Sequence, residues 1–433
     1  MEHLSATERL EQALARIGDP KGEGARACLT VYRERAKAEA GAADARARNG
    51  ISLGPLDGAI VSIKDLFDVA GEVTRAGSKV LAEEGKPAVS DAPVVRRLRK
   101  AGAVIVAKTN MSEFAFTGVG ANPHFGTPGN PADRARVPGG SSSGAAVAAA
   151  DGMCDIAIGS DTGGSCRIPA ALCGIVGWKP SRQRVPTEGA FPLSYSFDSI
   201  GSLARSVAAC AAADAVMAGE EPRTLEPAPL AGLRLGIPQG MPLDALDETV
   251  GKAFPEAIDR LNKAGVRLTG EKLPLIDEMT KLLNRTSIVV AEAYCIHREL
   301  LARRGDSVDP IVRARIERGR DISAAYFIAA VRERDALIRE MDARLVDVDA
   351  LVLPATTIVA PRMDEVAESQ GFMDRNAKLL RNTTIGNFFD LCGISLPLPR
   401  AGGLPTGLML MARNGHDRRL LRMAAAVERL FAG

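Results

Sequence analysis

Histidine is scarce in this chain of 433 residues, which has four: His3, His124, His297 and His416. None stands among the companion residues of a metal motif or of a histidine-based catalytic triad. His3 lies near a chain end, where fraying is expected, and we interpret His124 and His297 as core or surface polar groups. If the protein is an enzyme, its general base is therefore expected to be a different residue type.

Paired cysteines and long apolar runs are also missing. The seven cysteines include no CxxC pair, and their odd number argues against both a zinc knuckle and a disulfide scaffold. Reduced thiols in a cytoplasm are the simpler interpretation, so we expect a cytoplasmic protein without a metal. The N-terminal MEHLSATERLEQ lacks the apolar run of a signal peptide, and no stretch reaches the roughly 20 apolar residues of a membrane span.

An excess of positive charge is absent as well. Lys and Arg number 55 against 53 Asp and Glu, for a formal charge of +2, so no broad basic field exists to hold nucleic acid. The 12 Phe, 4 Tyr and 1 Trp are too few for base-stacking platforms or sugar-binding troughs. With 46% hydrophobic and 25% charged residues, the composition is that of an ordinary globular protein.

The order of predicted elements favours an α/β fold. Residues 5–48 are expected to form two helices, the first with a capping box at Ser5–Glu8, and we interpret them as a packing or oligomer-contact hairpin. From Gly54 onwards, the apolar runs GAIVSIKD, AVIVAKTN and DIAIGSD predict strands, separated by helices at 92–102 and 145–150. Such alternation predicts an α/β core with mostly parallel strand pairing.

A polar, Pro-rich connector at 220–232 follows this region. The connector is either a domain boundary or a surface loop, with the strands beyond it rejoining the same sheet. A helical stripe near 321–346 is interpreted as core.

Two loops are unusually rich in glycine and hydroxyl groups: Pro138–Gly144, which reads PGGSSSG, and Gly159–Pro169, which reads GSDTGGSCRIP. The first satisfies the glycine spacing of a phosphate-binding P-loop. However, Ala145 and Ala146 stand where that motif needs Lys and Ser or Thr, which argues against nucleotide binding. Lys64 ends the strand GAIVSIK, and alternation places Ile60, Ser62 and Lys64 on one face of it.

The second loop is suited to acyl transfer. Ser165 follows two glycines, which allow neighbouring backbone N–H groups to converge on one point and receive an oxyanion. A serine nucleophile needs a base, and with histidine scarce a lysine is the candidate. That lysine must be neutral, which burial in a dry site favours. A second serine can relay the proton, because a hydroxyl both donates and accepts.

These segments together resemble the amidase signature family of serine hydrolases. The resemblance rests on GPLDGAIVSIKDLFDVAG, AKTNMSEFAFTGVG, NPADRARVPGGSSSGAAVAAA and GSDTGGSCRIPAALCGIVGWKPS, in that order. It implies a single-domain α/β/α sandwich over 1–433 around a large mixed, mostly parallel sheet, with a Ser–cisSer–Lys triad and no cofactor. Within that domain we expect an N-terminal helical segment at 1–50, a signature core at 51–210 and a more variable part at 211–433 that completes the sheet and the substrate pocket.

The resemblance assigns roles by motif. Lys64 is the base, Ser141 the cis-serine that relays the proton and Ser165 the nucleophile. The remaining expected site residues are backbone donors and supporting side chains: an oxyanion hole from the N–H groups of Thr162, Gly163, Gly164 and Ser165, with Ser142, Asp161 and Arg167 in support. We interpret Asp161 and Arg167 as an ion pair that holds the loop. The second interpretation of Arg167 is that it anchors the substrate. Cys166, which stands where an aliphatic residue is usual, is read as a packing residue.

The implied activity is hydrolysis of a carboxylic amide, or of a related C–N bond, through a seryl acyl-enzyme. One alternative is the glutaminase (A) subunit of a tRNA-dependent amidotransferase, which shares these motifs but delivers ammonia to a partner. Another is a non-catalytic binding module, against which the complete triad argues. We expect a small-molecule amide as the partner, with no nucleic acid and no membrane, and leave open a homodimer through the N-terminal helices. The identity of the amide does not follow from the sequence.

Overall fold

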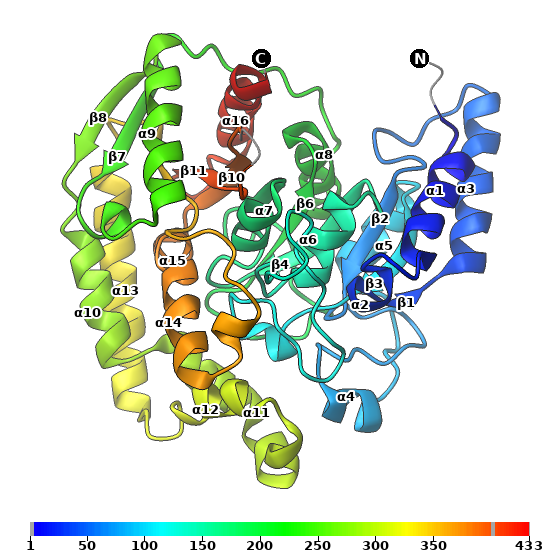
Figure 1. The fold of residues 1–433 in the computed structure, drawn as a ribbon, viewed down its shortest axis with the longest axis horizontal. Coiled ribbons are helices and arrows are strands. Elements are labelled where there is room, and N and C mark those ends of the chain that lie inside the picture. The colour runs from blue at the N-terminus through cyan, green and yellow to red at the C-terminus, as the bar shows by residue number, and fades with distance from the viewer. Residues whose placement is uncertain (1–3, 400–402, 433) are drawn as a thin grey trace.

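The computed structural model describes residues 4–399 and 403–432 and has one mixed sheet at its centre (Figure 1). Eleven strands form it among the described residues, in the order β1-β3-β2-β4-β6-β5-β10-β11-β9-β7-β8. Their bounds are β1 Cys28–Val31, β2 Ile60–Lys64, β3 Val104–Thr109, β4 Ile156–Asp161, β5 Val176–Lys179, β6 Ser199–Ala204, β7 Arg234–Pro238, β8 Arg267–Glu271, β9 Ala350–Pro354, β10 Cys392–Pro397 and β11 Gly407–Ala412.

Strand direction divides this sheet into blocks. Strand β2 pairs in parallel with β3 and β4, and β7 pairs in parallel with β8 and β9. The other six pairs, which join the two blocks and add β1 at one edge, are antiparallel. The expected large mixed sheet is confirmed. The parallel pairing that we expected to dominate is found in the two blocks, and antiparallel pairs outnumber it in the sheet as a whole.

Helices cover both faces of the sheet, so the fold has three layers (Figure 1). Residues of α5, α8, α9 and α16 share one apolar core with the sheet, and residues of α1, α3, α6, α7, α10, α13 and α15 share the cores on the other face. The bounds of these helices are α1 Ala6–Gly18, α3 Arg33–Arg48, α5 Pro93–Lys100, α6 Ser143–Ala150, α7 Arg167–Cys173, α8 Val207–Ala218, α9 Glu248–Lys263, α10 Leu275–Arg285, α13 Ala324–Arg344, α15 Thr383–Phe388 and α16 Asp417–Ala432.

The remaining helices connect these layers. They are α2 Gly24–Ala27, α4 Lys79–Glu84, α11 Ile288–Arg304, α12 Pro310–Glu317 and α14 Ser369–Leu380, with single 3₁₀ turns η1 Glu113–Ala115, η2 Met241–Leu243, η3 Gly305–Ser307 and η4 Asp364–Val366. None of the helices in the described ranges is long and apolar enough to cross a membrane.

The predicted N-terminal pair of helices is only partly correct. The first helix is confirmed, with the capping box in which Ser5 and Glu8 bond each other's backbone N–H groups. The predicted second helix is interrupted, because Cys28–Val31 forms strand β1 and only α3 continues as a long helix. Leu29, Thr30 and Val31 suit a strand, and pairing with the exposed edge of β3 outweighs the helix-favouring residues on either side.

The connector at 220–232 forms neither a helix nor a strand. The strands after it, β7 to β11, join the same sheet as β1 to β6, so the connector does not separate two sheets. In β2, alternation sends Val61 and Ile63 into the core beneath α5 and α8, while Ile60 packs in the core that contains α6. The same alternation directs Lys64 towards α6, where the serine-rich loop begins.

Candidate active site

The Lys64 ammonium lies between two serine hydroxyls. Its side chain is fully buried, and its Nζ donates hydrogen bonds to Ser141 Oγ at 2.8 Å and to Ser160 Oγ at 2.9 Å. Ser160 belongs to β4, the parallel neighbour of β2, so the carboxyl ends of both strands meet at this point. Ser141 lies just before α6, and the peptide bond between Gly140 and Ser141 is cis.

The surroundings of Lys64 favour its neutral form. Burial lowers the pKa of this lysine from 10.5 to about 8, although the charges of Cys166, Asp198 and Asp161 act in the opposite direction. Both direct contacts are neutral hydroxyl groups, not carboxylates. Loss of the proton therefore begins near physiological pH, as a general base requires.

The loop between β4 and α7 presents free backbone donors. The N–H groups of residues 162–165 donate no hydrogen bond to any other described residue. Buried N–H groups are nearly always paired, so an unpaired run of this kind marks a place for a ligand oxygen. Gly164 has φ +140°, and a Cβ there would overlap Thr383 Oγ1, so no other residue fits. Thr383 also donates to the carbonyl oxygen of Gly163 at 2.6 Å, which fixes the loop against α15.

A buried ion pair closes this loop. Arg167 donates to both carboxylate oxygens of Asp161, at 2.9 and 3.1 Å, and Asn387 donates to the same carboxylate at 2.8 Å. Burial alone would raise the pKa of Asp161, but the charge and hydrogen bonds of Arg167 outweigh it and lower that pKa to about 2. Since both side chains are fully buried, the pair lies inside the protein and does not line the pocket beside Ser165.

The other residues singled out in the sequence take supporting places. The Ser142 hydroxyl donates to the carbonyl of Ser160 at 3.3 Å, and its N–H donates to the carbonyl of Ser165 at 3.3 Å. Cys166 is buried, and burial raises the pKa of its thiol far above the usual range, so it is a packing residue here.

His124 and His297 make their contacts with residues other than Lys64, Ser141 and Ser165. His297 stacks against Phe114 with ring centroids 4.1 Å apart, and burial lowers its pKa to about 4. His124 contacts Glu113 at 3.0 Å, while His3 is outside the described residues. No cluster of His, Cys, Asp or Glu suited to a metal ion occurs within 4–399 or 403–432.

Ser165 faces a largely apolar pocket of about 140 Å³, here called the acyl pocket. Its walls come from η1 and the residues after it, from the β4–α7 loop and from helices α10, α11, α12, α14 and α15. Among the described residues, Arg315 of α12 is the one charged residue that lines it. Phe116 lies beneath the guanidinium with its ring centroid 4.6 Å away. The Arg315 side chain makes no hydrogen bond or ion pair with any described residue.

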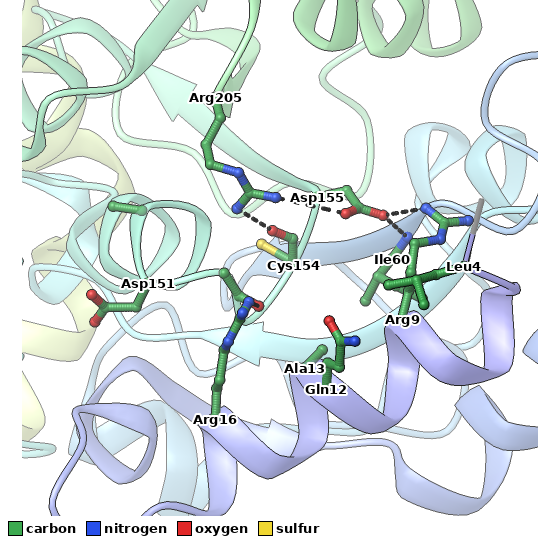
Figure 2. A pocket seen from close by; sticks show the side chains of 12 residues that line it. Leu4, Arg9, Gln12, Ala13, Arg16, Ile60, Asp151, Cys154, Asp155 and Arg205 are labelled. Carbon is green, nitrogen blue, oxygen red and sulfur yellow. Dashed lines mark hydrogen bonds and ion pairs between the residues drawn. The ribbon is translucent and has the colours of Figure 1, made fainter. Parts of the chain in front are cut away.

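A separate hollow of about 490 Å³ lies between α1 and the C-terminal end of α6 (Figure 2). Three arginines line it, but each is already engaged: Arg9 pairs with Asp155 at 2.8 Å, Arg16 bonds a carbonyl after α6, and Arg205 bonds the Ala149 carbonyl. Figure 2 shows the arginine contacts to Asp155 and to the Cys154 carbonyl. These cations complement the negative end of α6, whose opposite end follows Ser141 and Ser142. None of the predicted site residues lines this hollow.

Sequence reasoning missed several residues of the site. Ser160 lies directly before Asp161 in the glycine-rich motif, which was its only signal. Asp198 accepts a hydrogen bond from Thr162 Oγ1 at 2.5 Å, and no local pattern marks it. Arg315 lies in an ordinary helical run, VRARIERG, where nothing distinguishes it from its neighbours.

Comparison with known proteins agrees with this geometry. The amidase family profile, described as Amidase, matches residues 8–421. A 2-amino-5-chloromuconic acid deaminase from Comamonas testosteroni is 36% identical over 402 residues, or 92% of this chain and 87% of that protein. The A subunit of a glutamyl-tRNA(Gln) amidotransferase from Methanothermobacter thermautotrophicus is 33% identical, over 96% of this chain and 93% of that one. A crystal structure of an amidase superposes with a TM-score of 0.88 at 34% identity, covering 99% of this chain and 96% of that one.

The chain therefore belongs to the amidase signature family, as its sequence motifs indicated. It is an amidohydrolase that acts on linear amide C–N bonds.

Proposed function

We propose that this protein hydrolyses a carboxylate-bearing amide through a seryl acyl-enzyme, with Ser165 as nucleophile, Ser141 as proton relay and Lys64 as base. The observation that carries the proposal is the buried contact of 2.8 Å between Lys64 Nζ and Ser141 Oγ, beside a serine that opens onto a pocket. Once Lys64 has lost its proton, the same contact allows the Ser141 hydroxyl to donate to the lysine nitrogen.

The proposed reaction balances its protons within this chain and one water. Ser165 Oγ bonds the amide carbon while its proton passes through Ser141 to Lys64. The oxyanion binds the free N–H groups of residues 162–165, at positions where preorganised donors typically contribute 10²–10³-fold in rate (order of magnitude). The C–N bond then breaks as Lys64 returns the proton, again through Ser141, to the leaving nitrogen. Water attacks the acyl-enzyme by the same route and releases the acid.

A carboxylate on the acyl part of the substrate follows from Arg315. Burial lowers the pKa of its guanidinium to about 10, which leaves the side chain charged at neutral pH. A desolvated charge without a counter-ion is costly, and its Nε is buried without an acceptor. A substrate carboxylate supplies the missing charge and accepts the donors of the guanidinium fork. The name of the Comamonas relative, a deaminase of an aminochloromuconic acid, is consistent with an acidic substrate.

The test is a matched panel of amides, with release of ammonia as the readout. Malonamate, succinamate and glutamine carry a carboxylate, and butyramide is the neutral counterpart of succinamate. We expect turnover of the carboxylate-bearing amides, with kcat rising as the pH passes through about 8 because Lys64 becomes neutral. Ser165→Ala should abolish turnover while the protein stays folded, and a fluorophosphonate should label Ser165 in the wild type.

Arg315→Met tests the substrate class separately. A charge-assisted hydrogen bond contributes about 1.5–3 kcal/mol, so KM for the carboxylate-bearing amide should rise roughly 10–100-fold with little change in kcat. Arg318→Met is the matched control, because it removes the same charge from an exposed position at the end of the same helix. Faster turnover of butyramide than of succinamate, or equal effects of the two variants, would contradict this assignment.

The glutaminase chain of a tRNA-dependent amidotransferase remains the second candidate function, and its support is the relative that matches 96% of this chain. Glutamine also carries a carboxylate, so the acyl pocket alone does not separate the two candidates. The discriminating result is a chain that is inert towards every amide when alone and hydrolyses glutamine only when tRNA and a second protein chain are present.

A further inference from the structure

A second hollow adjoins the loop that carries Ser165. It has a volume of about 440 Å³ and is lined mainly by the segment 187–200, with Ser160 and Thr162 at its inner end. Ala115, Thr162 and Leu193 line both this hollow and the acyl pocket, so the two adjoin. Ser160 connects the second hollow to the proposed catalytic centre, because its hydroxyl bonds Lys64 Nζ at 2.9 Å.

The two hollows have opposite charge. Arg315 is the only charged side chain lining the acyl pocket, whereas Glu188 and Asp198 are the charged side chains lining the second hollow, here called the acidic pocket. Burial raises the pKa of Asp198 to about 6, against hydrogen bonds from Thr162, Ser194 and Leu193, so this carboxylate is charged at neutral pH. Glu188 is exposed and lies where the acidic pocket meets solvent.

The partition between the hollows is fixed in place at several points. Asp198 accepts from Thr162 Oγ1 at 2.5 Å and from the Leu193 N–H at 2.9 Å, which ties the segment 193–198 to the oxyanion loop. From the other side, Glu292 of α11 accepts hydrogen bonds from Ser196 at 2.5 and 3.1 Å. Because these hydrogen bonds fix the segment 193–198, the shape and charge of each hollow stay constant.

We propose that the acidic pocket receives the leaving amine, and that the opposite charges of the two hollows sort the halves of the substrate. This inference rests on the proposed function. The acyl part lies in the acyl pocket with its carboxylate on Arg315, and the C–N bond breaks at the partition. Lys64 returns its proton through Ser141 to the nitrogen, which departs as a neutral amine past Ser160. In the acidic pocket the amine then takes up a proton from the solvent, and the proton that the product acid releases after deacylation replaces it, so no hydroxide accumulates. The resulting cation is stabilised by Asp198 and Glu188.

The inference predicts that, among substrates with the same acyl group, kcat/KM depends on the charge of the leaving amine. The probes are three N-substituted forms of the fastest amide in the panel above, bearing an aminoethyl, a propyl or a carboxymethyl group on the nitrogen. The leaving groups are thus cationic, neutral and anionic, and amine release is measured by chromatography. We expect kcat/KM to fall in that order, by roughly tenfold between the first and the last, from a charge interaction at several ångströms.

Two substitutions at the mouth of the acidic pocket test whether its negative charge causes the preference for a cationic leaving group. Glu188→Gln and Thr187→Lys each make the pocket less negative, so each should shrink the ratio of cationic to anionic rates about threefold. Glu11→Gln, an exposed substitution on α1 outside this pocket, is the matched control and should leave the ratio unchanged.

The outcomes separate this inference from the proposed function. Turnover of the parent amide with no preference for leaving-group charge, or with a preference for the anionic group, overturns the inference alone. A preference that persists in both variants also overturns it, because the charge would then be read elsewhere. Failure of the chain to hydrolyse any amide in the panel overturns the proposed function, and the inference with it.

Discussion

Replacement of Lys64 by methionine should abolish turnover and at the same time raise stability at neutral pH. The pKa of this lysine is lowered from 10.5 to about 8, which corresponds to roughly 3 kcal/mol at about 1.4 kcal/mol per unit. That penalty is present in full at pH 7, where the lysine is protonated in both the folded and the unfolded chain. Methionine fills a similar unbranched volume without charge. Ser141 and Ser160 each lose a hydrogen bond, at a cost of about 1 kcal/mol apiece, so the net gain is about 1 kcal/mol.

The difference in the free energy of unfolding between Lys64→Met and wild type should change sign as the pH rises. Between pH 8 and 10.5 the unfolded wild-type chain binds more protons at Lys64 than the folded chain does. Its free energy of unfolding therefore rises with pH in this window, by up to about 1.4 kcal/mol per unit, and the variant lacks this rise. Lys64→Met should thus be the more stable protein at pH 7, and wild type the more stable one above about pH 9.

Urea denaturation of both proteins at pH 7, 8, 9 and 9.5 measures this crossover. Groups that do not feel the charge of Lys64 titrate equally in the two proteins, so the difference in the free energy of unfolding reports on Lys64 and on its neighbours Asp198 and Cys166. A difference that stays constant across the series would refute the reasoning, because Lys64 would then titrate alike in the folded and unfolded chains. A variant that is less stable at pH 7 by several kcal/mol would show that the two hydrogen bonds outweigh the burial penalty.

Two further substitutions test the loop that carries Ser165. Gly164→Ala should lower kcat by at least about 100-fold, because the φ of +140° and the overlap of the new Cβ with Thr383 displace the proposed oxyanion donors. Gly163→Ala should lower kcat much less, because the nearest atom to its new Cβ is the end of the Leu380 side chain at 3.2 Å. Arg167→Met should destabilise the protein by about 3–5 kcal/mol in urea denaturation, since it leaves Asp161 buried and unpaired, and a loss below 1 kcal/mol would contradict that account.

The sequence predicted those features that depend on local rules. Glycines that free backbone N–H groups marked the loop before Ser165, and a strand ending in a charged residue marked Lys64. Alternation along β2 placed Lys64 on one face with Ile60 and Ser62, and the family resemblance brought it together with Ser141. The structure has the Lys64–Ser141 contact. The assignment of base, relay and nucleophile to these residues remains a prediction.

Features that depend on distant pairing could not be predicted in this way. Ser160 contacts Lys64 only because β2 and β4 pair in parallel, and that pairing has no local signal. Arg315 is one of two arginines on α12, and its position over Phe116 distinguishes it from Arg313. The residues on either side of β1 favour helix, while the extended conformation of this strand follows from pairing with β3.

A lysine base, the role proposed for Lys64, places particular demands on its surroundings. A carboxylate in contact with Lys64 would hold its proton, and the pKa would return towards 10.5. Both direct contacts are hydroxyl groups, and Asp161, whose charge raises the pKa of Lys64, is bound by Arg167. The ion pair thus shapes the oxyanion loop and also limits the field that Asp161 exerts on Lys64. We infer that the Asp161–Arg167 ion pair has two effects: it holds the loop that carries Ser165, and it limits the rise in the pKa of Lys64 that the Asp161 charge causes. These effects explain the presence of Arg167, although its side chain does not line the pocket.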